Sequence, residues 1–357
     1  MPTVRSPEFS ARVMGVASFF VFVAFNPTQA LTTLEDSVNG AISLAVLYLT
    51  FMLTSLFIAV PIVQRFGPKI GLLGSSWTYL LFVAARSLPA DLKVLRLSAM
   101  YLTAFGVGAG GAVLWTSIGN PCLSLYFHDT DHAQALCLPR LEQVTLFSPK
   151  SAQIISTVFF FLNSLFAYAI VFACTRLQLP SNRMYLMFCL ICTVGCCLFA
   201  LLPKDVIVVK SRKTLTEKLL LTSRHMQRRS VYTLLPMWAY HHFVLAYSTG
   251  VVPQLANDPS IRSLVLFTLG LGICGGSFGS FCIAPTVRRV RVLAAVLVCG
   301  SVGIVISGFE NCASGMCPLL CFAAACMGVS WGCIPGNPVC SYLCLRLRAC
   351  MRVLRAV

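Results

Sequence analysis

The sequence predicts an all-α fold, a polytopic bundle of helices that spans a membrane. Two observations support this prediction. Apolar residues make up 57% of the 357 residues, while charged residues make up only 11%. The mean hydropathy is +0.83. The core of a soluble protein of this size cannot hide so much apolar surface, whereas a lipid bilayer accepts it as a solvent. The lipid bilayer is therefore the first expected partner of the chain.

About ten apolar stretches approach the length that a membrane-crossing helix needs, which is ~20 residues for ~30 Å of hydrocarbon. The third and the tenth are short. The predicted spans are residues 13–31, 41–63, 70–85, 97–118, 152–174, 184–202, 231–252, 264–283, 292–309 and 317–334.

The basic residues, which give the chain a formal net charge of +16, indicate the topology of these spans. If the loops alternate between two sides, all but six of the 27 Lys and Arg residues lie on one side. The six on the other side are Arg86, Lys93, Arg96, Arg176, Arg183 and Arg262. The positive-inside rule places the richer side, with both termini, in the cytosol. Nucleic acid is not an expected partner, because no basic domain with interleaved aromatic residues exists.

A basic polar segment, residues 204–230, divides the chain into two transmembrane parts. Residues 1–203 hold the first six predicted spans, and residues 231–357 hold the last four. A proline-containing helix end followed by a short basic loop occurs after the second span and again after the eighth. Parallel six-helix repeats of this kind are typical of major facilitator transporters. We therefore expect a six-helix N-terminal half, a cytosolic linker and an incomplete C-terminal half.

Several segments resemble the uncoordinated-ninety-three family, a branch of the major facilitator superfamily. They are Ala24-Phe25-Asn26-Pro27-Thr28-Gln29-Ala30-Leu31, Leu47-Tyr48, Arg65-Phe66-Gly67-Pro68-Lys69, Leu114-Trp115-Thr116 and, more weakly, Gly328-Val329-Ser330-Trp331-Gly332 up to Asn337. The resemblance covers roughly the first third of the chain well. It implies a fold of twelve spans, so the C-terminus is expected to be truncated by about two helices.

The resemblance implies a role but no substrate. One possibility is a transporter or facilitator of a small solute or ion, or a regulator of ion (potassium) homeostasis. The alternative is a non-transporting escort or regulatory partner of membrane channels or receptors, and a further alternative is a truncated, inactive product. No Asp, Glu, Lys or Arg lies centrally in a predicted span, which disfavours the carboxylate chemistry of most ion-coupled carriers.

The first span carries polar residues that are candidates for a solute path. Asn26, Thr28 and Gln29 surround Pro27, where amide groups and a carbonyl freed by the proline could bind a solute or a cation. Hydrogen bonding between helices is the alternative explanation. Glu35 follows on the exoplasmic side together with Asp36, and the two could gather cations at an entrance or belong to a solvated loop.

Further candidates for the solute path come from other spans. His241 and His242 lie in the seventh span and could titrate near neutral pH, although a packing role is the simpler explanation. Tyr48, Trp115 and Asn337 are added by the family resemblance, which implies a cavity lined by the first, fourth, seventh and tenth spans.

The loop from Arg65 to Lys69 is a candidate cytosolic gating loop. Gly67 permits a tight turn, Pro68 fixes the start of the next helix, and the two cations hold the loop at the membrane surface. In the superfamily such a loop controls rocking by pairing with a neighbouring helix end. This copy has Gln64 where an acidic residue usually stands. A gating loop and a turn that only sets topology both remain open.

No enzyme is expected, and no catalytic residue is predicted, because no serine, cysteine or paired-carboxylate arrangement suggests hydrolysis. The segment Gly270-Leu271-Gly272-Ile273-Cys274-Gly275 fits a dinucleotide-binding pattern. It lies within an apolar span with no strand before it, so close helix packing explains it and no cofactor is expected. No metal site is predicted. Cys312 and Cys317 share an exoplasmic loop and could form a disulfide.

Overall fold

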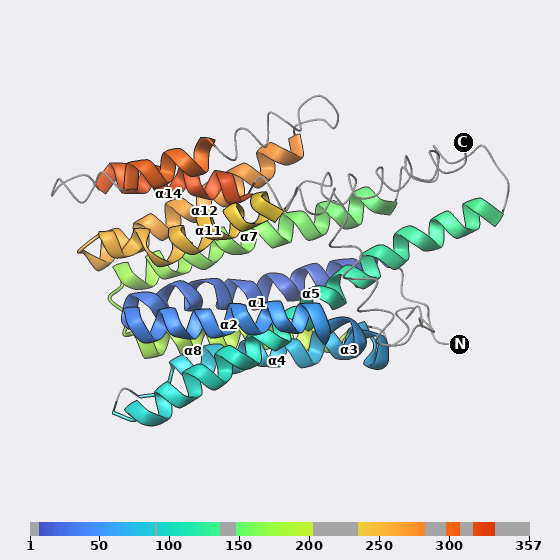
Figure 1. Cartoon of the computed structure of the whole chain (residues 1–357), viewed down its shortest axis with the longest axis horizontal. Helices are drawn as coiled ribbons and strands as arrows, with labels where there is room; N and C mark the ends of the chain where they lie inside the picture. Colours follow the sequence, from blue (N-terminus) through green and yellow to red (C-terminus); the bar gives the residue numbers. More distant parts are fainter. Residues whose placement is uncertain are drawn as a thin grey trace. The chain divides into compact units, whose positions relative to one another are not determined.

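The computed structural model describes residues 7–89, 91–135, 148–202, 235–282, 298–307 and 317–332. In these ranges the chain consists of α-helices joined by short turns, with one 3-10 helix and no strand (Figure 1). The predicted all-α fold is therefore confirmed. The chain divides into two compact units, which we call unit 1 (residues 1–163 and 179–223) and unit 2 (residues 164–178 and 224–357). The predicted linker, residues 204–230, lies outside the described residues.

Unit 1 is a bundle in which α1 packs against α8 and α2, and α5 packs against α2 and α4. Helix α4 also packs against α8. The helices are α1 (Pro7–Glu35), α2 (Ser37–Phe57), α3 (Ala59–Phe66), α4 (Pro68–Arg86), α5 (Lys93–Ala135), the first part of α7 (Ser148–Arg176) and α8 (Ser181–Ala200).

Helix α1 continues through Pro27, within the predicted span of residues 13–31. A proline has no amide hydrogen, so the carbonyl four residues earlier loses its helical hydrogen bond. The hydroxyl of Thr28 donates to the carbonyl of Ala24 at 2.8 Å, and the hydroxyl of Thr32 donates to the carbonyl of Thr28 at 2.7 Å. These side chains add bonds to the backbone on either side of the proline, although neither goes to the carbonyl of Val23 that the proline leaves unbonded.

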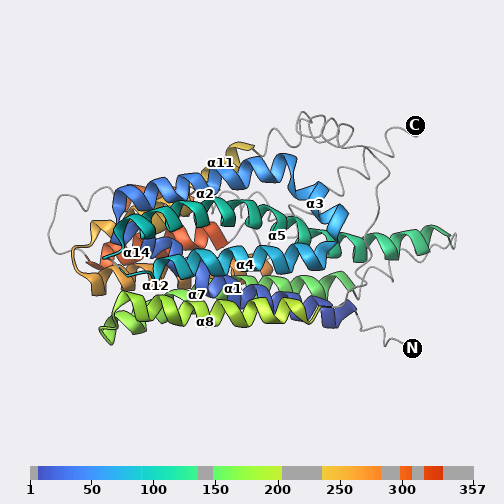
Figure 2. The same cartoon turned by 90° about the horizontal axis from the view of Figure 1, so that it is seen from below.

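The second predicted span, residues 41–63, is wrong as a single helix. The structure has α2 and α3, separated at Ile58, and Figure 2 shows the chain changing direction there. Pro61 lies in the first turn of α3 and cannot donate to the carbonyl of Phe57, so the helix is interrupted just before it. The prediction missed this break because the apolar run continues without interruption across the two helices.

The fourth predicted span, residues 97–118, lies within the apolar segment Lys93–Ile118, which is long enough to cross a membrane. Helix α5 has 43 residues, from Lys93 to Ala135, and part of the expected cytosolic loop after residue 118 is therefore helical. At 1.5 Å per residue this helix is roughly 65 Å long, about twice the thickness of the hydrocarbon core. The apolar segment of α5 ends near Ile118, so the later turns extend beyond the length that lipid requires.

Unit 2 is built around the close pairing of α12 with α14, and α11 also packs against α14. Gly272 and Gly276 of α12 face the carbonyl oxygens of Ala325 and Val329 on α14 so closely that a Cβ atom would overlap them. The prediction that small residues in this span serve helix packing thus holds at Gly272. The elements are α11 (Leu235–Gly250), the 3-10 helix η1 (Val252–Leu255), α12 (Pro259–Cys282), an apolar helix Val298–Ser307 and α14 (Cys317–Gly332).

Five helical segments in the described residues are long and apolar enough to cross a membrane: Arg12–Glu35, Ser37–Phe57, Lys93–Ile118, Ser181–Ala200 and Pro259–Gly276. Helix α2 shows what these segments present outward. Its side chains Leu49, Met52, Leu53 and Phe57 are each about half exposed, which is unfavourable in water and favourable against lipid. The chain is an integral membrane protein.

Close contact between α5 and its neighbours depends on glycine. A Cβ atom at Gly108 would overlap the carbonyl oxygen of Leu47 on α2, and one at Gly110 would overlap the hydroxyl of Thr78 on α4. A Cβ atom at Gly111 would lie 2.9 Å from the hydroxyl oxygen of Tyr79. Gly106, on the same helix, has no neighbouring atom within 4 Å among the described residues. Three of these four glycines therefore allow close packing of α5.

We expect Gly108→Ala to lower the stability of the protein by about 1–3 kcal/mol, because the new methyl group must displace backbone rather than a flexible side chain. Gly106→Ala is the matched control, since it adds the same methyl group on the same helix into open space. The control should leave stability unchanged or raise it by up to about 1 kcal/mol, as expected for replacing a helical glycine. Thermal unfolding of both purified variants in detergent compares them, and equal effects would contradict the packing argument.

Candidate functional site

Amide side chains in the middle of unit 1 connect three of its helices. The side-chain nitrogen of Asn26 on α1 donates to the side-chain oxygen of Asn163 on α7 at 2.7 Å. One turn further along α1, the amide of Gln29 donates to the hydroxyl of Tyr48 on α2. The structure therefore joins Asn26, Gln29 and Tyr48, which the sequence proposed separately, and adds Asn163. These hydrogen bonds are expected to be worth roughly 0.6 kcal/mol each in a membrane protein.

An aromatic cluster continues this polar group along α1. The rings of Phe22 on α1 and Trp115 on α5 lie 5.6 Å apart between centroids, at an interplanar angle of 36°. Tyr79 of α4 contacts Phe22 edge-on at 5.6 Å and Phe25 at 4.7 Å. Trp115, a predicted path residue, thus meets the helix that carries Asn26. We call Phe22, Asn26, Gln29, Tyr48, Trp115 and Asn163 the polar–aromatic network.

Parts of the polar–aromatic network are accessible, and others are buried. Tyr48 and Trp115 are each 40% exposed, whereas Asn163 is 1% exposed. Asn26 and Gln29 are intermediate. Thr28 is fully buried and its hydroxyl is bonded to the backbone of its own helix, so it stands apart from the network. The network therefore exposes part of its amide, hydroxyl and ring surfaces.

Asn163 and Tyr79 were missed by the sequence reasoning, although a signal for Asn163 was present. It is an amide inside the apolar run of the fifth predicted span, and polar residues inside spans are candidates for function or for interhelical bonding. The same argument had selected Asn26. Tyr79 gave no such signal, because a tyrosine in an apolar helix is common and its position depends on how α4 packs.

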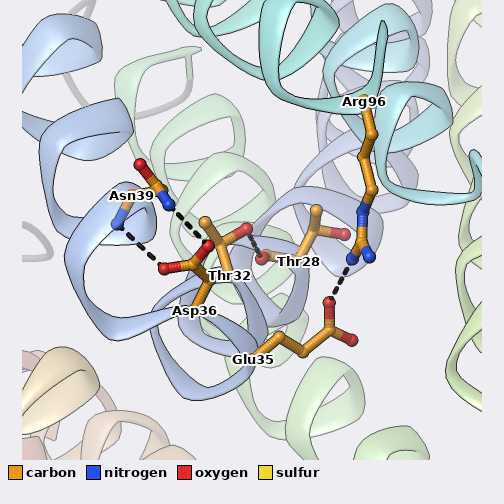
Figure 3. Close-up of polar contacts among 6 residues, drawn as sticks. All are labelled: Thr28, Thr32, Glu35, Asp36, Asn39 and Arg96. Atoms are coloured by element: carbon orange, nitrogen blue, oxygen red, sulfur yellow. Dashed lines mark hydrogen bonds and ion pairs between the residues drawn. The ribbon is translucent and has the colours of Figure 1, made fainter. Parts of the chain in front are cut away.

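The turn between α1 and α2 carries the two acidic residues proposed as an exoplasmic mouth. Glu35 accepts a hydrogen bond and ion pair from Arg96 of α5 at 3.0 Å (Figure 3). Asp36 caps α2, since one carboxylate oxygen accepts the Asn39 amide N–H at 3.0 Å and the other accepts the Asn39 side chain at 2.8 Å. Both carboxylates therefore have local partners. Hydrogen bonds from Asn39 hold the pKa of the Asp36 carboxyl below its usual value.

Arg86 differs from the expectation for a loop residue. It was counted among the exoplasmic loop cations, but it is the last residue of α4 and is only 5% exposed. Its guanidinium lies over the ring of Phe82 at 5.0 Å, and one nitrogen donates to the hydroxyl of Ser43 on α2 at 3.2 Å. A buried charge of this kind was not predicted, because α4 was expected to end one residue earlier.

The candidate gating loop is a tight turn between α3 and α4. Gly67 has a φ of 85°, a backbone conformation that favours glycine, and Pro68 occupies the first turn of α4. The Arg65 guanidinium lies 5.5 Å from the centre of the Phe66 ring. Within the described residues neither Arg65 nor Lys69 makes an ion pair. A gating role of this loop stays a prediction.

The remaining predicted site residues are only partly described. His242 on α11 is exposed, and His241 belongs to the same helix, but its side chain lies outside the described residues. Asn337 and Cys312 lie outside them altogether, and of Cys317 only the backbone at the start of α14 is described. The predicted disulfide and the roles of these residues stay predictions.

Comparison with known proteins identifies the family. A family model described as "Ion channel regulatory protein UNC-93" matches residues 34–308, most of the chain. The chain belongs to the UNC-93 family. The predicted relationship to the uncoordinated-ninety-three family is therefore confirmed.

Curated relatives of this UNC-93 family chain match shorter segments. "UNC93-like protein 3" of Arabidopsis thaliana is 31% identical over 121 residues, which are 34% of this chain and 25% of that protein. The "Putative potassium channel regulatory protein unc-93" of Caenorhabditis elegans is 34% identical over 77 residues, 22% of this chain and 11% of that protein. The matched segments thus span a quarter or less of each relative.

A solved structure supports the fold of the UNC-93 family chain. The crystal structure of a D-xylose-proton symporter superposes with a TM-score of 0.54, covers 91% of this chain and 80% of the symporter, and shares 15% sequence identity. At this identity the likeness concerns the fold alone. It confirms the prediction of a major-facilitator-like helical bundle for this multi-pass membrane protein.

We expect Asp36→Ala to destabilise this UNC-93 family protein by about 1 kcal/mol at pH 7, because α2 loses its N-cap. The folded pKa of Asp36 lies below its unfolded value of about 3.9, so the carboxylate stabilises the fold above that pH and loses this effect as the pH falls through the folded pKa. The difference between wild type and variant should therefore shrink below about pH 4. Thermal unfolding across pH measures it. Asp36→Asn is the control, since it keeps a capping oxygen without the charge, and a pH-independent deficit of Asp36→Ala would contradict the argument.

Proposed function

We propose that this UNC-93 family protein binds a small polar solute or a cation at the polar–aromatic network and lets it cross the membrane. The observation that carries the proposal is the network itself, in which Asn26, Gln29 and Tyr48 join neighbouring helices and remain partly accessible. A transporter needs binding groups inside the membrane that are satisfied by each other when the solute is absent. Paired amides and hydroxyls meet this requirement, since each can exchange its partner for a solute.

The chemistry of the polar–aromatic network favours facilitation over coupled uphill transport. Its six members carry no carboxylate, ammonium or guanidinium group, so no proton or ion-pair partner is available within it. Amide oxygens and the phenol oxygen can coordinate hydroxyl groups or a weakly hydrated cation, and the rings of Trp115 and Tyr48 can pack against a sugar-like face or attract a cation. No catalytic step is part of the proposal.

The proposed transport uses two halves, residues 1–203 and 231–357, joined by the basic segment 204–230 and rocking about the binding site. His241, His242 and Asn337 are proposed as contributions of the C-terminal half, and Arg65, Gly67 and Lys69 as the cytosolic gating loop. The distribution of basic residues supports cytosolic positions for both termini, in the plasma membrane or an internal membrane.

Flux through vesicles that contain the purified protein tests the proposal, with potassium ions and glycerol as two separate probes. We expect at least one probe to cross faster than in protein-free vesicles. Tyr48→Phe and Asn26→Ala should reduce this flux several-fold, because each removes a hydrogen-bonding group from the network. Tyr101→Phe is the matched control: its hydroxyl bonds Asn39 at 2.9 Å, outside the network. Equal losses in the control and the network variants, or no flux in the wild type, would refute the proposal.

The second candidate function is regulation of a membrane channel without transport. Two observations favour it: the description of the family and the printed name of the Caenorhabditis elegans relative, which is a putative potassium channel regulatory protein. The half-exposed apolar face of α2, with Leu49, Met52 and Leu53, would then contact another membrane protein instead of lipid.

The two functions make different predictions for the α2 surface. If the chain regulates a channel, expression of the wild type should change the potassium conductance of cells, and replacing Leu49 and Leu53 by Ala should abolish this change. The purified protein should then give no flux in vesicles. If the chain transports, the same variant should keep its vesicle flux, because these side chains lie on a different face from Tyr48. Whole-cell recording and vesicle flux with one pair of proteins distinguish the two.

A further inference from the structure

The length of two helices places the corner between α3 and α4 at a membrane–water interface. Helix α2 has 21 residues and α4 has 19, so at 1.5 Å per residue each is about 30 Å long, the thickness of the hydrocarbon core. Helix α2 begins directly after Asp36, and α4 ends at Arg86, which bonds Ser43 near that start. The opposite ends of the two helices, joined by α3, therefore meet the other face of the membrane, where the chain changes direction (Figure 2).

The corner between α3 and α4 presents apolar side chains outward. The inner face of α3 is fixed by Ala59 and Val63, which are buried against α5. On the outside Val60 and Phe66 are about half exposed, and Ile70, in the first turn of α4, is 60% exposed. Exposed apolar side chains at the end of a span are unfavourable in water and favourable among the acyl chains next to the headgroups.

Two cations lie among these apolar side chains. Arg65 is exposed, with its guanidinium 5.5 Å from the centre of the Phe66 ring, and Lys69 is partly exposed just beyond the Gly67 turn. Neither cation makes an ion pair within the described residues. Residues 37–90, which include α2, α3 and α4, contain no Asp or Glu. The corner therefore carries two positive charges and no carboxylate on its own helices to neutralise them.

We propose that the α3–α4 corner binds the headgroup of an anionic phospholipid. The Arg65 guanidinium and the Lys69 ammonium donate to the anionic oxygens of the headgroup, while Phe66 and Ile70 pack against the adjoining part of the acyl chains. A zwitterionic headgroup fits less well, because its ammonium group finds no carboxylate on α2, α3 or α4.

The choice of a lipid follows from position and charge together. In the topology proposed above, this corner faces the cytosolic leaflet, which carries the anionic lipids. Cations on an apolar surface at headgroup depth match a molecule that is anionic at one end and apolar at the other. The inference goes beyond the proposed function, because lipid binding does not require that the chain moves a solute.

Competition between two lipids tests the proposal. The full-length chain, purified in detergent, is mixed with equimolar phosphatidylserine and phosphatidylcholine that have the same acyl chains, and native mass spectrometry counts the lipids retained on each protein. Basic residues near an anionic surface each contribute about 1 kcal/mol, so we expect the wild type to retain phosphatidylserine on the order of tenfold more than phosphatidylcholine.

Variants assign the preference to the corner. Arg65→Gln combined with Lys69→Gln should remove most of it, and each single variant should remove part, since both positions are at the surface and the substitutions keep the side chains polar. The matched control combines Arg176→Gln with Arg183→Gln. Both of these arginines are exposed, and Arg176 likewise lies over a phenylalanine, at 5.2 Å from the Phe172 ring centre, so this control should keep the full preference.

Three results overturn the proposal. The first is a wild type that retains both lipids equally. The second is an unchanged preference in the Arg65→Gln and Lys69→Gln double variant, which places the anionic lipid elsewhere. The third is an equal loss in the Arg176→Gln and Arg183→Gln control, which reduces the preference to the net charge of the protein. Vesicle flux does not enter this measurement, so the lipid site and the proposed function succeed or fail separately.

Discussion

The close approach of α5 to α2 and α4 is the constraint on which the rest of unit 1 depends. Gly108 and Gly110 let the backbone of α5 lie directly against Leu47 and Thr78, where any side chain would keep the helices apart. In a membrane the apolar effect does not drive helices together, so contact area and close packing must do so. The glycine positions therefore determine where the candidate site residues of α5 and α2 lie.

This packing explains how the polar–aromatic network is assembled. Trp115 lies about two turns beyond Gly108 on α5, and Tyr48 directly follows Leu47, whose carbonyl faces that glycine. The contact between α5 and α2 thus fixes where Trp115 and Tyr48 lie along α1. Asn26 and Gln29 are one turn apart on α1, so they share a face and reach Asn163 and Tyr48 respectively. Helix packing thus positions the side chains of the network, and their hydrogen bonds orient them.

Much of the fold could be predicted from the sequence, because lipid imposes a simple length and composition on its helices. Where predicted helix boundaries differ from the structure, the differences have local causes. Pro61 divides an apolar run that hydropathy reads as one span, and α5 continues past Ile118 into residues whose composition resembles a loop. Neither departure changes the class of protein, since both lie where a helix leaves the hydrocarbon.

The candidate site was predictable only in part. Asn26, Gln29, Tyr48 and Trp115 were selected individually, by polarity inside a span or by family resemblance, and their connection required the packing of three helices. Arg86 shows the reverse limit. A charge next to an apolar run suggests a solvated loop, whereas the structure buries this charge and bonds it to Ser43 of α2, a helix distant in sequence. A contact between side chains of two helices cannot be recognised from the sequence of either helix alone.

The distribution of charge along unit 1 bears on what the protein can carry. The neutral amides of Asn26 and Gln29 lie about 9 Å or more along α1 from Glu35, at 1.5 Å per residue. At that end Arg86, Lys93 and Arg96 balance Glu35, Asp36 and Asp91, and the carboxylates of Glu35 and Asp36 are engaged with local partners. Glu35 and Asp36 alone suggested a mouth that concentrates cations. A mouth with this balance of charge does not. Passage of a neutral polar solute past it needs no compensation of charge, which favours such a solute over a bare cation at the polar–aromatic network.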